Sequence, residues 1–584
     1  MDIFKAAQHG DMARVVHLVE EKGVDPNNTD AANAAVMHWA AINNRADLVQ
    51  FLASKGARVN VKGGDLKTSP LYWAVTQGHL DMVVLLVRLG ARLDDTDVDV
   101  NGHNALFVAA QMSDLPMLAL CTAHGMDVDC VDGDGLSPLL WVCMHRAHNV
   151  DLLRMLLSLG ADASAKEPAT GNTALHLAVT VGRARRSFIN ALLRAGAVLD
   201  AVNGEGQTAA VAAVHAGVDW IASYLEHKGA AHDDTRAQLC SFAPHHTMWA
   251  TFVVVPTVGS LVSTLSWRAL LPTVFLLLVC LCVPAVQTML GKLCAMEATS
   301  PARQAQAGPS ARDWSSFGVN VGSIFWLVLP YYVWIWQSQG AAFNVVITAA
   351  IGAMCYNLHL AVTTSSAVPG VRANQRDKLQ AVRELAEAGA LSKGDLCATC
   401  LIRTPLRAKH CGFCGHCVSK FDHHCPFVLN CVGANNYRYF FGFLLFATLA
   451  IGMWLLATAR FLTAALPIGS AGPAVLFLWF HYQPFTACLF LLGCLHEFWI
   501  GCLLFFHTGL VLKGETTYEQ ISAGSHGHSH GAGGQCARSP YNRGRAANVA
   551  DFLGFPVAGE KPMGVDWGTT YQWPPSAFSA DDQV

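Results

Sequence analysis

The feature that most constrains the fold is a series of long, nearly uncharged stretches that begins near residue 247. Charged residues make up only 14% of the 584-residue chain, against about 25% in an average soluble protein. An apolar stretch of about 20 residues, folded as a helix, spans the hydrocarbon core of a bilayer. We therefore predict six membrane-spanning helices, at approximately 247–267, 269–290, 318–338, 341–362, 440–460 and 484–512.

The distribution of basic residues predicts how these helices are oriented. Lys292, Arg303 and Arg312 follow the second predicted span, and the segment after the fourth span is also basic, whereas residues 463–483 contain neither lysine nor arginine. Loops rich in lysine and arginine stay on the cytoplasmic side. The N-terminus shows no basic segment followed by an apolar core, so we expect no cleavable signal peptide. Both termini and the segment between spans four and five are therefore predicted to be cytosolic.

Residues 1–230 repeat with a period of about 34, the length of a helical hairpin repeat. Equivalent positions in successive units are occupied by Val36–Ala40, Pro70–Ala74, Ala105–Ala109, Pro138–Val142 and Ala174–Ala178. Each segment is similar to the T-P-L-H-x-A signature of ankyrin repeats. Glycine-containing turns such as Leu89–Ala91 separate the units, because glycine accepts the left-handed conformation that ends a helix. We predict a solenoid of six or seven units, with degenerate end units at 2–30 and 204–229.

Several polar features allow more than one interpretation. Residues 297–313 and 523–539 have the composition of flexible linkers, and we interpret the alternating histidines of 526–530 as part of a solvated loop, because no cysteine or carboxylate completes a metal site. His496 and Glu497 lie within the sixth predicted span. Ionisable groups at membrane depth either serve a function or pair with each other or a neighbouring helix. Both interpretations remain open for these two residues.

A cluster of seven cysteines and four histidines within 35 residues indicates metal binding. Its members are Cys397, Cys400, His410, Cys411, Cys414, His416, Cys417, His423, His424, Cys425 and Cys431. In the cytosol, such spacing favours metal sites over disulfides. A structural zinc takes four sulfur or nitrogen ligands, so two zinc ions use eight ligands and leave at least one cysteine free. The segment is too polar to fold around its own core, so we expect zinc to stabilise it.

Spacing alone does not identify the free cysteine, but Cys425 is closely preceded by Asp422 and His423. An imidazole that accepts the thiol proton raises the reactive thiolate fraction, and a carboxylate orients the imidazole. Cys425 also lies 15 residues before the apolar stretch that begins near Phe440. The thiol is therefore expected near the bilayer surface, where a membrane-embedded acyl chain could reach it.

The segment from Cys397 to Phe440 resembles the DHHC cysteine-rich domain of protein S-palmitoyltransferases. The resemblance is carried by Cys397-x2-Cys400, Pro405-x-Arg407, His410-Cys411-x2-Cys414-x2-Cys417, Asp422-His423-His424-Cys425 and Asn430-Cys431-x-Gly433-x2-Asn436-x3-Phe440. It implies two interleaved structural zinc sites, one of Cys397, Cys400, His410 and Cys417, the other of Cys411, Cys414, His424 and Cys431. It also implies that Cys425 accepts the acyl group, with His423 as its base and Asp422 as the group that orients His423.

Two segments after the last predicted span are similar to further motifs of this family. Residues 516–519 look like the TTxE motif and residues 540–548 resemble the C-terminal motif, which implies that Thr517 and Asn548 support the active site.

The chain also departs from the family pattern. It has Phe427 in place of a frequent tryptophan, Val368–Gly370 in place of the DPG motif and Thr404 in place of a frequent basic residue. Arg407 and Lys409 are then the candidates to hold the phosphates of acyl-CoA.

Six spans preceded by ankyrin repeats resemble the huntingtin-interacting ankyrin subgroup of this family. The resemblance implies a predominantly α-helical protein whose parts are an ankyrin solenoid (1–230), spans one to four (247–363), a cytosolic linker with the zinc domain (364–439, core 397–440), spans five and six (440–512) and a cytosolic tail (513–584). It implies transfer of an acyl group from acyl-CoA, such as palmitoyl-CoA, through acyl-Cys425 to cysteines of proteins recruited by the repeats, at an endomembrane such as the Golgi. Because the net charge is −3, nucleic acid is excluded as a partner.

Two other classes of protein share parts of this outline. One is an ankyrin-bearing ion channel of the TRP type, with a pore loop at residues 474–478, and the other is a non-enzymatic zinc scaffold. A channel does not need a zinc module between spans four and five. The intact sequence from Asp422 to Cys425 argues against a scaffold without enzymatic activity.

Overall fold

The computed structural model describes residues 2–182, 184–226, 317–318, 321–322, 324–325, 328–371, 373–391, 394, 396–466, 474–525 and 541–554. The first two predicted spans, the linker at 297–313 and the histidines of 526–530 lie outside these residues. The chain forms two compact units. The first comprises Met1–Gln238 with Gly370–Thr404, and the second comprises Leu239–Pro369 with Pro405–Val584.

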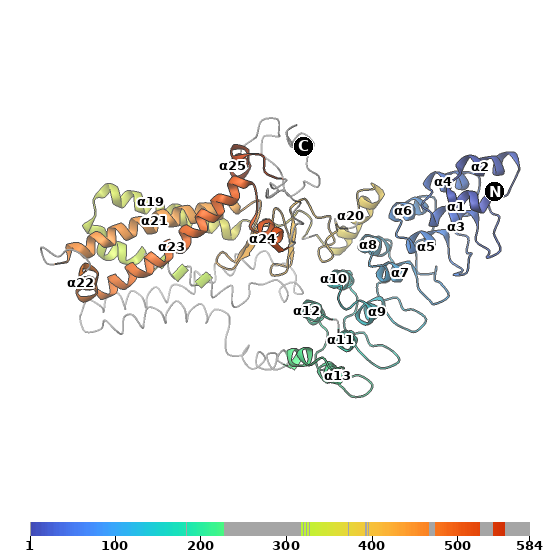
Figure 1. Ribbon diagram of the computed structural model, residues 1–584, viewed down its shortest axis with the longest axis horizontal. Helices are drawn as coiled ribbons and strands as arrows, with labels where there is room; N and C mark the ends of the chain where they lie inside the picture. Colours follow the sequence, from blue (N-terminus) through green and yellow to red (C-terminus); the bar gives the residue numbers. More distant parts are fainter. Residues whose placement is uncertain are drawn as a thin grey trace, which may run out of the picture. The chain divides into compact units, whose positions relative to one another are not determined.

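The first unit contains the predicted helical repeats as consecutive helix pairs (Figure 1), and the described part of the repeats ends in a helical segment at 219–226. The helices are α1 (Ile3–His9), α2 (Met12–Val16), α3 (Val36–Ile42), α4 (Ala46–Ser54), α5 (Pro70–Thr76), α6 (Leu80–Arg88), α7 (Ala105–Gln111), α8 (Leu115–Ala123), α9 (Pro138–His145), α10 (Val150–Leu159), α11 (Ala174–Thr180), α12 (Arg186–Arg194) and α13 (Ala209–His215). A π-helical turn, η1 (His17–Glu21), follows α2. The helical repeat predicted from the period of about 34 residues is confirmed.

Polar side chains at the helix starts explain why the repeats stack in one register. The Ser69 hydroxyl accepts a hydrogen bond from the backbone N–H of Tyr72 and caps the N-terminus of α5. Within the third helix, the His38 ring accepts a hydrogen bond from the N–H of Ala35 and bonds through its other nitrogen to the carbonyl of Thr68 in the next repeat. These buried bonds satisfy loop backbone groups and join adjacent repeats.

A further helix, α20 (Gln375–Glu387), also belongs to the first unit, although it follows the fourth predicted span in the sequence. Its apolar side chains Val382 and Ala386 are buried in the core of the repeats. The Gln375 amide donates to the carbonyl of Leu159 at the end of α10. Part of the predicted linker is therefore a helix packed on the solenoid.

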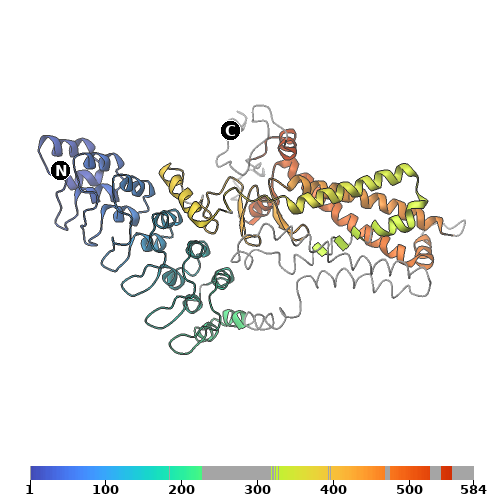
Figure 2. The same cartoon turned by 180° about the vertical axis from the view of Figure 1, so that it is seen from behind.

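The second unit is built on helices that are long and apolar enough to cross a membrane. Within the described residues these are α19 (Ala341–Thr363), α21 (Tyr437–Ala464) and α23 (Pro484–Lys513), with 23, 28 and 30 residues. They pack side by side (Figures 1 and 2), and they are helical where the fourth, fifth and sixth spans are predicted. The third predicted span is described only in part, and its described end contains the turns η3 (Tyr331–Ile335) and η4 (Trp336–Ser338).

Two short hairpins and three short helices complete the second unit. Strands β1 (Lys409–Cys411) and β2 (His416–Val418) pair antiparallel, as do β3 (His423–Cys425) and β4 (Asn430–Val432). The helices are α22 (Ala474–Tyr482), α24 (Thr517–Ser525) and α25 (Arg545–Leu553). The Asn430 amide donates to the carbonyls of Ala361, Val362 and Thr364 at the end of α19. These bonds fasten the second hairpin to the end of a predicted membrane helix.

Candidate active site and metal centres

The strand register places one histidine opposite one cysteine in each hairpin. His410 pairs with Cys417 across β1 and β2, and His424 pairs with Cys431 across β3 and β4. Directly opposed residues lie on the same face of a hairpin, whereas successive residues of one strand point to opposite faces. Each hairpin therefore presents an imidazole and a thiol together, and Cys411, next to His410, points to the other face.

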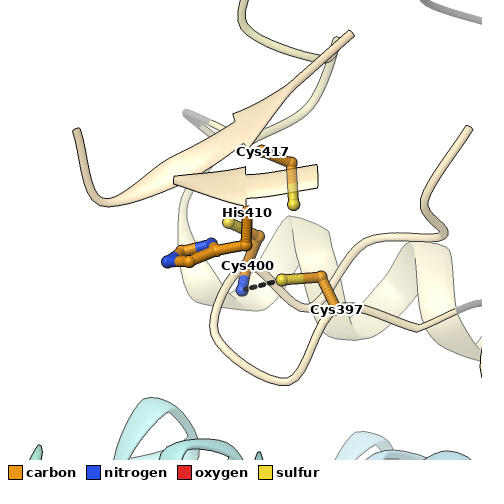
Figure 3. A group of neighbouring side chains, drawn as sticks. All are labelled: Cys397, Cys400, His410 and Cys417. Atoms are coloured by element: carbon orange, nitrogen blue, oxygen red, sulfur yellow. Dashed lines mark hydrogen bonds between the residues drawn. The ribbon is translucent and has the colours of Figure 1, made fainter. Parts of the chain in front are cut away.

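The first candidate metal centre contains Cys397, Cys400, His410 and Cys417 (Figure 3). One possible ligand atom from each residue lies within 4.8 Å of the others. The backbone N–H of Cys400 donates to the sulfur of Cys397 at 3.4 Å, as the dashed line in Figure 3 marks. Such a bond within a Cys-x2-Cys turn stabilises sulfur as a thiolate, the form that binds a metal.

The second candidate centre contains Cys411, Cys414, His424 and Cys431, again within 4.8 Å of one another. The sulfur of Cys414 lies 3.3 Å from the sulfur of Cys431 and 3.3 Å from Nδ1 of His424, and Cys431 Sγ lies 3.6 Å from the same nitrogen. Zinc bonds of about 2.0–2.3 Å in a tetrahedron imply ligand separations of about 3.5–3.8 Å. Both groups offer three sulfurs and one imidazole, a donor set that fits a closed zinc site.

Alternate residues of β3 point to opposite faces of the strand, one toward the second candidate metal centre and the other toward the candidate catalytic residues. His424 points to the second candidate metal centre, whereas His423 and Cys425 share the opposite face of the strand. His423 Nδ1 lies 2.6 Å from Oδ2 of Asp422. Cys425 and Asp422 are buried, with relative exposures of 5% and 1%. The structure thus brings together the three residues predicted to be catalytic, and it leaves Cys425 and His416 outside both metal groups.

Thr517 holds the Asp422 carboxylate with two hydrogen bonds. Its backbone N–H donates to Oδ1 at 2.9 Å and its hydroxyl donates to Oδ2 at 2.7 Å. Thr517 is the first residue of α24, and the N-terminus of a helix favours a carboxylate because it presents unpaired N–H groups. Asp422 is therefore fixed on one side by the helix and on the other by His423.

These contacts move the pKa values of both groups. Burial alone raises the pKa of Asp422, but hydrogen bonds from His423 and Thr517 outweigh it and hold the pKa of the carboxyl below its usual range. Burial alone lowers the pKa of His423, but its interactions with Asp422 and Cys425 raise that pKa to about 10. The surroundings of His423 therefore favour its imidazolium form.

The T-x-x-E pattern of residues 516–519 forms a capping box at the start of α24. The backbone N–H of Thr516 donates to the Glu519 carboxylate, and the N–H of Glu519 donates to the Thr516 hydroxyl. The same carboxylate binds Arg407 through two hydrogen bonds of 2.7 and 2.6 Å. The Arg407 side chain is only 2% exposed, and its guanidinium also stacks on Tyr541. Arg407, predicted to hold acyl-CoA phosphates, therefore makes its described contacts within the protein.

Lys409 and Asn548, which were also predicted to serve the site, contact residues close to the point where α23 ends and α24 begins. Lys409 Nζ lies 3.4 Å from the ring centroid of Tyr518. The Asn548 amide donates to the carbonyl of Leu512 at 2.9 Å, while its oxygen accepts from the N–H of Arg543. Leu512 belongs to the last turn of α23, whose carbonyls have no partner within the helix. Asn548 therefore caps the helix that leads into the capping box.

An apolar cavity among the long helices of the second unit shares lining residues with the buried cluster that contains Cys425. Cys425 packs in one buried cluster with Met354, Phe443 and Ala447, and these three residues also line the cavity. Trp454 and His496 line it as well. His496 Nδ1 bonds to the carbonyl of Leu492 in its own helix. The cavity thus shares residues with the cluster around Cys425, and its lining is apolar apart from the His496 ring and the indole N–H of Trp454.

Sequence reasoning missed several polar residues around this site. His507 is buried in α23, and its Nδ1 lies 3.0 Å from the hydroxyl of Tyr437, which is 70 residues away in the chain. Lys420 and Asp551 form a mostly buried ion pair of 2.7 Å. The capping-box pattern could have predicted the bonds of Glu519 with Thr516, but no local pattern indicates the partner of His507, Lys420 or Arg407.

Comparisons with known proteins define the class. The DHHC palmitoyltransferase family matches residues 391–524. Ankyrin repeats match residues 3–97, 106–149 and 170–204. These matches define a DHHC palmitoyltransferase with N-terminal ankyrin repeats, a type of repeat that mediates protein–protein interaction. Both resemblances stated from the sequence are confirmed.

Full-length relatives extend the match to nearly the whole chain. The chain is 32% identical to palmitoyltransferase ZDHHC17 of Homo sapiens, over 98% of this chain and 88% of the relative. It is 30% identical to palmitoyltransferase Hip14 of Drosophila melanogaster over the same shares, and 30% identical to putative palmitoyltransferase ZDHHC13 of Danio rerio over 100% and 88%. The chain belongs to this family of ankyrin-repeat palmitoyltransferases and is a protein S-palmitoyltransferase of the membrane.

Proposed function

We propose that Cys425 carries the acyl group between acyl-CoA and a cysteine of a substrate protein. His423 accepts the proton of the Cys425 thiol, and the thiolate attacks the carbonyl carbon of the acyl-CoA thioester. The bond between that carbon and the CoA sulfur breaks, and the proton passes from His423 to the departing CoA thiolate. In the second step the substrate thiol gives its proton to His423, and its sulfur attacks the carbonyl carbon of acyl-Cys425. The bond between that carbon and the Cys425 sulfur breaks, and the proton passes from His423 to the Cys425 thiolate.

The observation that supports this assignment is the division of β3 into two faces. The strand turns His424 toward a set of metal ligands, and it turns His423 and Cys425 to the face on which Asp422 binds His423. A cysteine that belongs to neither ligand set, beside an imidazole oriented by a buried carboxylate, is the arrangement that activates a thiol. Thr517 supports it by holding Asp422, and Asn548 supports it by capping α23.

Two zinc ions are proposed as structural cofactors of the cysteine-rich domain. Cys397, Cys400, His410 and Cys417 would hold one ion, and Cys411, Cys414, His424 and Cys431 would hold the other. Four protein ligands close a zinc site, so zinc here supplies folding free energy and no open coordination position. The hairpins are only three residues per strand, which makes them dependent on such cross-links.

Acyl-CoA is proposed as the acyl donor, with its chain among the membrane helices. The cavity that Met354 and Phe443 line is mostly apolar, and both residues also belong to the buried cluster that contains Cys425. A long acyl chain gains about 0.8 kcal/mol for each CH₂ group that it buries. Lys409 and Arg407 remain the basic residues proposed for the CoA phosphates. For Arg407 that role requires sharing the guanidinium that binds Glu519.

We further propose six membrane spans, with the repeats, the cysteine-rich domain and the C-terminus in the cytosol of an endomembrane such as the Golgi. Described helices α19, α21 and α23 support the last three spans, and the charge of the loops supports the orientation. The ankyrin repeats would recruit the substrate proteins.

An acyl-transfer assay of the purified full-length protein tests the central assignment. The protein is incubated with an alkyne analogue of palmitoyl-CoA, and the label is detected before and after hydroxylamine, which cleaves thioesters. We expect a hydroxylamine-sensitive label on the wild type and none on Cys425→Ser. The matched control is Cys355→Ser, which changes an exposed cysteine of α19 and should label normally. Equal labelling of Cys425→Ser and wild type would refute the nucleophile.

A further inference from the structure

His507 is a buried polar side chain beside the catalytic pair that the proposed chemistry does not use. It lies near the C-terminal end of α23, and only 3% of the residue is exposed. One ring nitrogen lies within 4.8 Å of a carboxylate oxygen of Asp422 and of a ring nitrogen of His423. Burying a polar group away from water is unfavourable unless it is hydrogen-bonded, so its placement at this point requires an explanation.

The surroundings of His507 fix the position of its ring. The hydroxyl of Tyr437 and Nδ1 of His507 are 3.0 Å apart, and both residues are buried. Phe440 packs edge-on against both histidines, with ring centroids 5.4 Å from His423 and 5.2 Å from His507. The two imidazole centroids are 5.9 Å apart. His507 and Phe440 therefore lie beside the His423 imidazole, and Tyr437 contacts His507.

We propose that His507, held by the Tyr437 hydroxyl, is a positioning residue that keeps the His423 ring directed at Cys425. Asp422 binds only one nitrogen of His423, which leaves the ring free to swing about that bond unless neighbouring side chains confine it. His507 and Phe440 supply that confinement. The inference rests on the proposed role of His423 as the base.

The test measures formation of acyl-enzyme in a single turnover, using purified full-length protein in detergent and saturating palmitoyl-CoA analogue. His507→Phe keeps a ring of similar size and removes both nitrogens. We expect its rate constant to fall about 10- to 100-fold, because displacing a reacting group by about 1 Å can slow a reaction about 100-fold. The final labelled amount should stay near the wild-type value. A purely structural defect lowers the labelled amount, since it reduces the folded fraction, and leaves the rate constant of the remaining molecules unchanged.

Tyr437→Phe provides a second test should His507→Phe fail to fold, because it removes only one hydroxyl. Loss of this bond should lower the rate constant about 3- to 10-fold. Its matched control is Tyr439→Phe, whose hydroxyl binds Arg438 away from the two histidines and whose removal should change the rate less than twofold.

Rate constants of His507→Phe and Tyr437→Phe within twofold of the wild type would overturn the inference, and so would an equal loss in Tyr439→Phe. Cys425→Ser separates this failure from failure of the proposed function. A label that survives in Cys425→Ser refutes the nucleophile itself, whereas a normal His507→Phe with an unlabelled Cys425→Ser refutes only the positioning role.

Discussion

Replacing Thr517 with valine removes a single hydroxyl from the set of hydrogen bonds that holds Asp422. The lost bond runs from Thr517 Oγ1 to Asp422 Oδ2 at 2.7 Å, and its acceptor is the same oxygen that binds His423. Valine has nearly the same shape as threonine, and the backbone N–H of residue 517 still reaches Oδ1. The substitution therefore weakens the support of the carboxylate without removing the carboxylate or the helix.

The size of the effect follows from the burial and charge of the acceptor. Asp422 is 1% exposed, so water cannot replace the lost donor. A hydrogen bond to a charged group contributes about 1.5–3 kcal/mol. Since about 1.4 kcal/mol corresponds to a tenfold change in rate, Thr517→Val should slow acyl-enzyme formation about 10- to 150-fold.

The assay is the single-turnover labelling of purified protein, with thermal unfolding measured in parallel. Thr517→Ser is the matched control, because it keeps the hydroxyl and should retain a rate within about threefold of the wild type. A Thr517→Val rate close to the wild-type value would show that the carboxylate needs no hydroxyl partner, and the account of Asp422 as the fixed orienting group would be wrong. Equal losses of rate in Thr517→Val and Thr517→Ser would also refute this account.

Three further predictions concern other parts of the molecule. Glu519→Gln should lower the apparent unfolding temperature and slow labelling, because it removes the negative charge that faces the buried Arg407 guanidinium, at a cost of roughly 3–5 kcal/mol; an unchanged melting curve would contradict this. Val382→Asp should release α20 from the repeats by burying a charge, seen as faster hydrogen exchange across Gln375–Glu387; unchanged protection would count against the packing. Chelation should remove two zinc ions per chain, measured by mass spectrometry, and abolish labelling; full activity of metal-free protein would rule out the scaffold role.

Local patterns predicted the elements whose signals are repeated along the chain. The 34-residue period predicted the helix pairs, and uncharged stretches predicted α19, α21 and α23 to within a few residues. Cysteine and histidine spacing predicted a metal module, because ligands from a Cys-x2-Cys turn are held by the turn itself. The division of histidines between the two faces of β3 also follows from strand alternation once the strand is known.

The contacts of Arg407 could not be predicted from the sequence. Its charge and its place in the motif predicted a phosphate contact, whereas the structure pairs it with Glu519, 112 residues along the chain. The helix α20 was likewise not predicted, because the surrounding segment has the polar composition of a linker and only Val382 and Ala386 are buried. Two buried side chains on a short helix produce too weak a periodic signal to predict its partner.

The sequence by itself determined the repeats, three long apolar helices, the possible metal ligands and the candidate nucleophile, because periodicity, length and ligand spacing are properties of neighbouring residues. The tertiary structure alone decided that Thr517 holds Asp422 from 95 residues away, that His507 lies beside His423 and that Tyr437 contacts His507. These partners meet because α21 and α23 pack against each other and α24 begins at the end of α23. Which side chains meet at such a crossing depends on how whole helices pack, and no short stretch of sequence contains that information.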